Sequence, residues 1–65
     1  MRIEACKLHK GDLFEFDGLE LVAVSDWTLF GVLVADKKNF NELGVYTYDQ
    51  VRNLEIEANV EVKIQ

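Results

Sequence analysis

The chain has 65 residues, which is enough for one domain with a single small core. One cysteine excludes an internal disulfide, so stability must come from packing or from a partner; 49% apolar residues and no proline make packing feasible. Twelve acidic against seven basic residues give a net charge of −5. Because the bases are scattered, this charge disfavours direct nucleic-acid binding and favours a protein partner with a basic surface.

The sequence also excludes an obvious membrane or export segment. No run approaches the roughly 18 apolar residues that a membrane helix needs. The start, Met1–Glu4, lacks the long apolar region of a signal peptide. We therefore expect a complete cytoplasmic protein that makes no membrane contact.

Turn signals divide the first half of the chain into short extended segments. The Asp17-Gly18 pair is the strongest of them, because both central positions of a type I′ hairpin turn need positive φ. The segment Phe30–Ala35 is almost continuously apolar, so we expect it to be buried on both faces or covered by a loop. The predicted strands are Arg2–Leu8, Leu13–Phe16, Leu19–Ser25 and Phe30–Ala35.

The middle of the chain is predicted to be less regular. Residues 36–44 form the longest polar stretch and are expected to be a loop. The β-branched and aromatic residues of Val45–Tyr48 predict a strand. Asp49 is positioned to cap a short turn over Gln50–Asn53, which is too short for an α-helix and is predicted to be 3₁₀.

The final segment, Leu54–Gln65, alternates between apolar and polar residues without interruption. Side chains on a strand alternate faces, so this pattern predicts a strand with one face packed and the other in solvent. Such half-buried strands are typical of antiparallel sheets. Full extension would span about 40 Å, which exceeds the width of a small barrel, so we expect a bend near Ala58-Asn59.

These elements together predict an all-β protein, a small antiparallel barrel of five to six strands with a short 3₁₀ turn before the last strand. The segment Lys10–Val24, with its Gly-Asp turn, apolar run and Asp-Gly hairpin, resembles the opening of SH3-like domains. The resemblance implies an SH3-like barrel spanning residues 1–65. It implies nothing about function, because one fold serves many functions.

Few residues suggest metal or catalytic chemistry. Cys6 and His9 are spaced as Cys-x-x-His, but a zinc site needs three or four protein ligands. Asp12 or a second copy of the chain would have to complete the set. The alternative, which we favour, is a packed cysteine beside a solvated histidine. We therefore expect no cofactor, no metal and no enzymatic activity.

Aromatic residues give the more specific indication of a binding surface. Phe14, Phe16, Phe30 and Tyr46 are expected in the core. Trp27 lies in a turn signal, while Phe40 and Tyr48 flank the long loop on the other side. Large aromatic side chains with a polar atom dominate protein interfaces. We expect Trp27, Phe40 and Tyr48 to approach one another in a partner-binding face; the alternative for Trp27 is a lid over the core.

The carboxylates Glu55, Glu57 and Glu61 share one face of the final strand. We expect them to border the binding face and to steer a basic partner, although they would also simply solvate the strand and discourage aggregation. The leading hypothesis is a non-enzymatic protein-binding or regulatory module, of the kind that phages and mobile elements encode. The alternative is an acidic inhibitor that mimics nucleic acid and occupies a basic groove. Pairing of a terminal strand with a second copy would give a homodimer.

Overall fold

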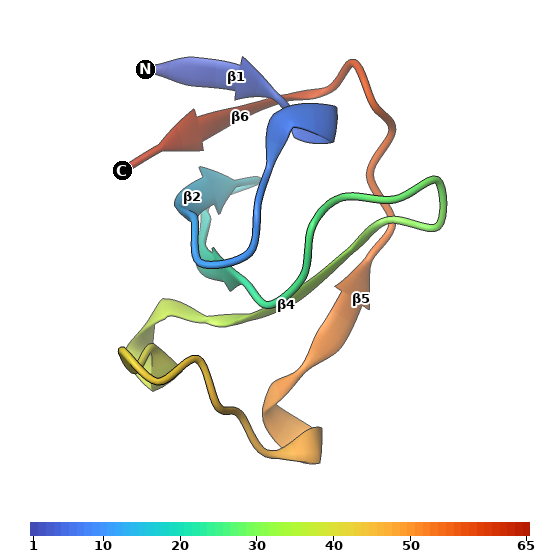
Figure 1. Cartoon of the computed structure of the whole chain (residues 1–65). Helices are drawn as coiled ribbons and strands as arrows, with labels where there is room; N and C mark the ends of the chain where they lie inside the picture. The colour runs from blue at the N-terminus through green and yellow to red at the C-terminus, as the bar shows by residue number, and fades with distance from the viewer.

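Six strands form one antiparallel sheet in the computed structural model, which describes all residues from 1 to 65 (Figure 1). Their order across the sheet is β1-β6-β2-β3-β4-β5. The strands are β1 (Arg2–Glu4), β2 (Leu13–Phe16), β3 (Leu19–Ala23), β4 (Val32–Asp36), β5 (Arg52–Leu54) and β6 (Glu61–Ile64). Three 3₁₀ turns accompany them: η1 (Ala5–Lys7), η2 (Lys37–Asn39) and η3 (Tyr48–Gln50). The prediction of an all-β protein with up to six antiparallel strands is confirmed.

The sheet is open, with β1 and β5 at its two edges. The chain between β5 and β6 crosses from one edge region to the other, as the orange segment of Figure 1 shows. Backbone bonds tie this segment to the start of the chain, from the Ala5 N–H to Val60 O and from the Cys6 N–H to Ala58 O. None of the helical turns has the length and apolarity that crossing a membrane requires.

The first hairpin forms as the sequence predicts. Phe16 lies opposite Leu19 across the β2–β3 turn. Asp17 and Gly18 have φ values of 53° and 77°, and Asp17 is the only non-glycine residue with positive φ. This agrees with the requirement of the type I′ turn for two left-handed residues.

The core lies inside the curled sheet and contains no buried polar side chain. Side chains from four strands and from the segments around η1 and residue 56 form it. Its nine members are Ala5, Leu8, Phe14, Leu21, Ala23, Val32, Val34, Ile56 and Val62. Val22 and Ala35 are also buried and lie directly opposite each other, so the centre of β3 and β4 is covered on both faces.

The prediction of one strand over Leu54–Gln65 is wrong, although its alternation is real. The chain leaves the sheet after Leu54, turns at Ala58-Asn59 and re-enters as β6. The expected bend is therefore a complete turn, fixed by a bond from the Val60 N–H to Glu57 O. Apolar positions remain more buried than their polar neighbours throughout the segment.

The predicted strand Val45–Tyr48 is also wrong, for a local reason. The Asn41 amide donates to Val45 O over 2.7 Å and accepts from the Val45 N–H over 3.2 Å, so it replaces a neighbouring strand. The Gln50 side chain accepts from the Thr47 N–H over 2.9 Å. This contact places the 3₁₀ turn at Tyr48–Gln50 rather than at Gln50–Asn53, and Thr47 rather than Asp49 occupies its N-cap position.

Two other expected boundaries shift. The strand expected over Arg2–Leu8 ends at Glu4, and the following turn η1 brings Ala5 and Leu8 into the core. Phe30, expected in a buried strand, lies outside β4 and is almost fully exposed, and Leu33 within β4 is also exposed.

Candidate functional site

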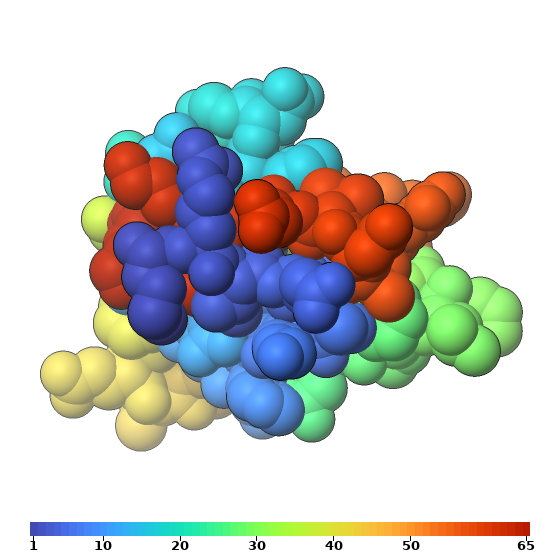
Figure 2. All heavy atoms as spheres, turned by 90° about the horizontal axis from the view of Figure 1, so that it is seen from above, coloured from blue at the N-terminus to red at the C-terminus, as the bar shows by residue number.

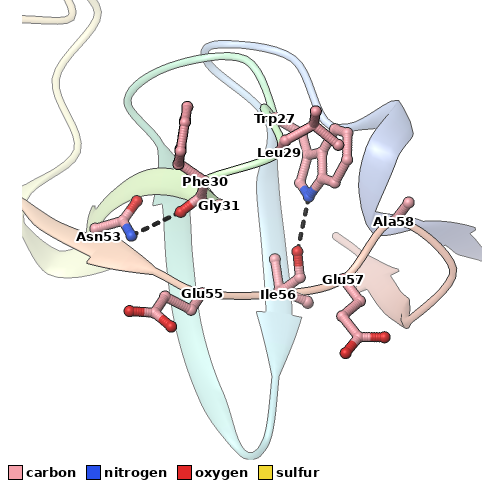
Figure 3. Close-up of a pocket in the computed structure, with 9 residues that line it drawn as sticks. All are labelled: Trp27, Leu29, Phe30, Gly31, Asn53, Glu55, Ile56, Glu57 and Ala58. Atoms are coloured by element: carbon pink, nitrogen blue, oxygen red, sulfur yellow. Dashed lines mark hydrogen bonds between the residues drawn. The ribbon is translucent and has the colours of Figure 1, made fainter.

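The largest hollow on the surface lies between the hairpin around residues 28–31 and the chain that leaves β5. We call it the Trp27 hollow, and its volume is about 670 Å³. Figure 3 shows the two walls, with Trp27, Leu29 and Phe30 on one side and residues 53–58 on the other. Its lining residues are Trp27, Leu29, Phe30, Gly31, Asn53, Glu55, Ile56, Glu57 and Ala58.

A tight turn over residues 28–31, here called the 28–31 tip, forms one wall of this hollow. Thr28 and Gly31 exchange two backbone bonds of 2.8 and 2.9 Å, which forms an isolated antiparallel bridge. The Thr28 hydroxyl donates to Gly31 O over 3.2 Å and accepts from the Phe30 N–H over 3.1 Å. The side-chain amide of Asn53 donates to Phe30 O over 2.9 Å. The tip is therefore anchored within itself and to β5.

Leu29 and Phe30 occupy the two central positions of this tip and point into solvent. Leu29 is 90% exposed and Phe30 is 86% exposed. Figure 2 shows the segment as the light-green projection at one end of the molecule. Burial of a side chain of this size stabilises a folded protein by about 1.5–3 kcal/mol. Leu29 and Phe30 gain little of this stabilisation within the chain.

Gly31 permits the close approach between the tip and β5. Its φ is +113°, and a Cβ atom at this position would overlap the carbonyl oxygen of Leu54 and lie 3.1 Å from Asn53 Oδ1. Only glycine fits this combination of positive φ and contact with a neighbouring backbone. The position of Leu29 and Phe30 is thus set by rigid packing behind them.

Trp27 forms the inner wall of the hollow. Its side chain is half-buried and packs against the core cluster, and its indole Nε1–H donates to Ile56 O over 2.8 Å. Its backbone N–H also donates to Leu8 O over 3.3 Å. Trp27 therefore covers part of the core, and the rest of its surface lines the hollow.

Glu55 and Glu57 supply the charge of the hollow. Both are exposed, and neither takes part in any of the three ion pairs of the structure. In Figure 3 their carboxylates extend away from the indole, on the far side of the segment from Trp27. No basic residue lines the hollow, and Glu55 and Glu57 are its only charged lining residues.

The shifted pKa values lie elsewhere. Hydrogen bonds from Gln65 and Lys37, together with the lysine charge, lower the pKa of Glu20 below its usual 4.5. A hydrogen bond from the Thr47 hydroxyl, 2.6 Å long, lowers the pKa of Asp49. Both groups are stabilised as anions on the surface.

The three aromatic residues predicted from the sequence to form one face lie in three different places. Phe40 lines a second hollow of about 280 Å³, together with Tyr46 and Lys10. Tyr48 is 97% exposed and lines no hollow. The loops that carry Trp27 and Phe40 lie at opposite ends of the molecule in Figures 1 and 2. The structure therefore brings Trp27 together with Glu55 and Glu57, but not with Phe40 or Tyr48.

Glu61 is likewise separate from the hollow. It lies on β6, directly opposite Glu4 of β1. The expected row of three carboxylates is divided by the turn at Ala58-Asn59. Glu61 belongs to the edge region of the sheet, and only Glu55 and Glu57 belong to the candidate site.

Cys6 and His9 show no arrangement for metal binding. Cys6 is exposed in η1, and His9 Nδ1 lies 3.7 Å from Asp26 Oδ1. Asp12 accepts from the His9 backbone N–H over 2.9 Å. No group of three or more His, Cys, Asp or Glu side chains lies close enough to hold a metal ion.

Leu29 and Phe30 are the site residues that sequence reasoning missed. The available signal was the pattern Thr28-Leu29-Phe30-Gly31, in which two large apolar residues separate a Thr from a Gly. Read as a turn of two residues, this pattern places both side chains at a hairpin tip. Read as the start of an apolar strand, it places Phe30 in the core.

No protein-family model, no curated protein and no solved structure matches the chain.

Proposed function

We propose that the chain is a non-enzymatic protein-binding module whose contact surface is the Trp27 hollow with the 28–31 tip. The observation that supports this proposal is the exposure of Leu29 and Phe30 on a turn that is firmly held by Thr28, Gly31 and Asn53. Single exposed apolar residues are ordinary, but an adjacent pair beside an apolar hollow is typical of an interaction site.

The chemistry of the site favours a partner segment that is apolar with basic residues beside it. Trp27, Leu29 and Phe30 offer an apolar wall, and burial of rigid aromatic side chains supplies much of the affinity in interfaces. The exposed carboxylates of Glu55 and Glu57 beside the hollow, with a net charge of −5 for the chain, would raise the association rate for a basic surface. Association should therefore slow as salt concentration rises.

The proposal is tested by capture of partners from a nuclease-treated lysate with immobilised protein. The chain offers matched variants, because Leu43 and Tyr48 are exposed to 87% and 97% and lie outside the hollow. A specific partner should bind the wild type and the Leu43→Ser/Tyr48→Ser variant, and should be lost with Leu29→Ser/Phe30→Ser. Equal retention by all three proteins, or loss only with Leu43→Ser/Tyr48→Ser, would contradict the proposed site.

A second candidate is an acidic inhibitor that occupies the nucleic-acid groove of its target. Its support is the set of unpaired, exposed carboxylates of Glu55, Glu57 and Glu61. Other surface charges oppose it, since Lys63 lies between Arg2 and Glu15 on the sheet and interrupts the acidic surface. The Glu55→Lys/Glu57→Lys variant separates the candidates, because a mimic loses its target whereas an apolar contact loses mainly association rate.

The proposal also includes an SH3-like arrangement of the strands and a cytoplasmic location for the protein. Three consecutive antiparallel strands, β2 to β4, support an SH3-like arrangement, whereas the 3₁₀ turn η3 precedes β5 and not, as expected, the last strand, β6. The composition is compatible with a small cytoplasmic accessory protein of phage or mobile-element type. The capture experiment tests this setting through the identity of the partner.

A further inference from the structure

The edge strand β1 presents free backbone groups to solvent. It forms the upper edge of the sheet in Figure 1 and faces the viewer in Figure 2. Bonds from the Ile64 N–H to Met1 O and from the Ala5 N–H to Val60 O show that the odd-numbered residues of β1 face β6. Because backbone groups alternate along an antiparallel strand, the N–H and C=O groups of Arg2 and Glu4 point outward.

The same strand carries charges that have no opposite partner across β6. Arg2 lies opposite Lys63 and Glu4 lies opposite Glu61, and all four side chains are exposed. Like charges directly opposite each other destabilise a sheet. Neither Arg2 nor Glu4 takes part in an ion pair within the chain.

We propose that β1 pairs with β1 of a second copy of this chain, about a twofold axis that passes beside Ile3. In this register Arg2 of each copy lies opposite Glu4 of the other, and the outward backbone groups of the two residues exchange N–H···O bonds. Each arginine then faces a carboxylate on the same side of the sheet. The two six-stranded sheets become one continuous antiparallel sheet.

The charges of β1 select this register among the symmetric ones. A shift of the twofold axis to Arg2 places the two copies of Arg2 opposite each other, and a shift to Glu4 does the same with Glu4. Both arrangements bring like charges together. Only the register centred on Ile3 pairs opposite charges in both halves of the contact.

The other open edge does not offer the same complementarity. A symmetric pairing of β5 centred on Asn53 places Arg52 opposite Leu54. Arg52 already forms an ion pair with Asp36 over 3.2 Å, and the Asn53 side chain is bonded to the 28–31 tip. The observations therefore assign the contact to β1.

Apolar contact adds to the backbone bonds. Ile3 is half-buried and packs against the core, and in the proposed dimer the two Ile3 side chains meet on the inner face. Met1, directly before β1, is 83% exposed and adds apolar surface at this edge. The contact is short, so we expect a dimer that dissociates measurably on dilution.

Charge exchange between two variants tests the pairing. Sedimentation equilibrium of the wild type from about 10 μM to about 1 mM should show a concentration-dependent rise toward the dimer mass. Glu4→Arg alone and Arg2→Glu alone should each weaken association at least tenfold, since each places like charges across the axis. An equimolar mixture of the two variants should form a heterodimer, because each new side chain then faces its opposite charge.

Matched controls exclude an effect of net charge. Glu42→Arg and Lys38→Glu change the charge by the same amounts at exposed loop positions that take part in no ion pair. Both should dimerise like the wild type. A monomeric wild type over the whole concentration range, or failure of the two β1 variants to associate when mixed, would overturn the proposal.

A crosslink gives an independent test of the register. In a Cys6→Ser background, Ile3→Cys places two thiols in a non-hydrogen-bonded pair with Cα atoms about 4.5 Å apart, within the range of a disulfide. Mild oxidation should give a covalent dimer. Lys38→Cys in the same background should not, and crosslinking of both variants to the same extent would refute a specific contact.

The dimer and the partner site are separable. The Trp27 hollow lies at the end of the sheet next to β5, whereas the proposed contact lies at the opposite edge strand. Leu29→Ser/Phe30→Ser should therefore leave the dimer intact, and Glu4→Arg should leave one-to-one partner binding intact. Failure of one proposal does not imply failure of the other.

Discussion

Trp27 and Ile56, which are 29 positions apart in the chain, are joined by a 2.8 Å hydrogen bond from the indole Nε1–H to a backbone carbonyl (Figure 3). The bond connects the hairpin after β3 to the segment that leaves β5. It fixes the spacing between the two walls of the hollow. Trp27 therefore supports the shape of the site, while Leu29 and Phe30 provide its free apolar surface.

Substitution of Trp27 should reduce stability in two steps. Trp27→Phe retains most of the apolar contact and loses the bond to Ile56, so the free energy of unfolding should fall by about 1 kcal/mol. Trp27→Ala also removes the packing against the core and should cost about 2 kcal/mol or more. Urea denaturation of both variants measures these losses. If Trp27→Ala were as stable as the wild type, the indole would not be part of the core.

Substitution of Gly31 should destabilise the protein more than substitution of Gly11. Both glycines have positive φ, of +113° and +95°, but a Cβ atom at Gly11 would meet nothing within 4 Å. Gly11→Ala thus reports the backbone strain alone, about 1–3 kcal/mol. Gly31→Ala should cost at least about 2 kcal/mol more, because the backbone of Leu54 blocks the methyl group. Equal losses in thermal denaturation would show that the tip is free to move away from β5.

Glu20 should stabilise the folded protein at neutral pH, and this contribution should be lost in acid. Its pKa is lower in the folded chain than its usual 4.5, so the folded state binds fewer protons than the unfolded state as the pH falls below 4.5. Its contribution is present above that pH and is lost as the pH falls through the folded pKa. The difference in unfolding free energy between the wild type and Glu20→Gln should therefore be constant at neutral pH and shrink below pH 4.5. A difference that grows in acid would contradict the assignment.

The exposed tip should be neutral for stability. Leu29→Ser and Phe30→Ser remove side chains that have little contact with the rest of the chain, so unfolding free energies should change by no more than about 0.5 kcal/mol. Chemical denaturation checks this directly. A larger loss for Phe30→Ser would mean that the ring packs onto the chain and is not free for a partner.

Local patterns were sufficient to predict the strands β1 to β4 approximately, but not β5, whose first two residues fall in the predicted 3₁₀ turn. The Asp17-Gly18 turn and strict alternation identified the first hairpin and the packed face of the last segment, because both depend on residues near one another in sequence. The break after Leu54 was not predictable from alternation, because residues 55–60 keep the same alternation of burial outside the sheet. The strand predicted over Val45–Tyr48 does not form, because the side chains of Asn41 and Gln50 make the backbone hydrogen bonds that a neighbouring strand would otherwise supply.

The candidate site was only partly predictable. Trp27, Glu55 and Glu57 were identified from their chemistry, and the structure brings them together around one hollow. Phe40 and Tyr48 were grouped with them on the assumption that their loops meet, which depends on the path of the chain across the sheet. Phe30 was assigned to the core because apolar residues favour burial, and only the bridge between Thr28 and Gly31 reverses that expectation.

The most direct test of the partner site is the indole Nε1–H resonance of Trp27, which is unique because the chain has one tryptophan. In a ¹⁵N-labelled sample, titration with the captured partner should shift this resonance together with the amides of residues 28–31 and 53–58. The amides of the loop that contains Phe40 and Leu43 should remain unchanged. Shifts confined to that loop, with no change at the Trp27 indole, would contradict a partner site at the Trp27 hollow.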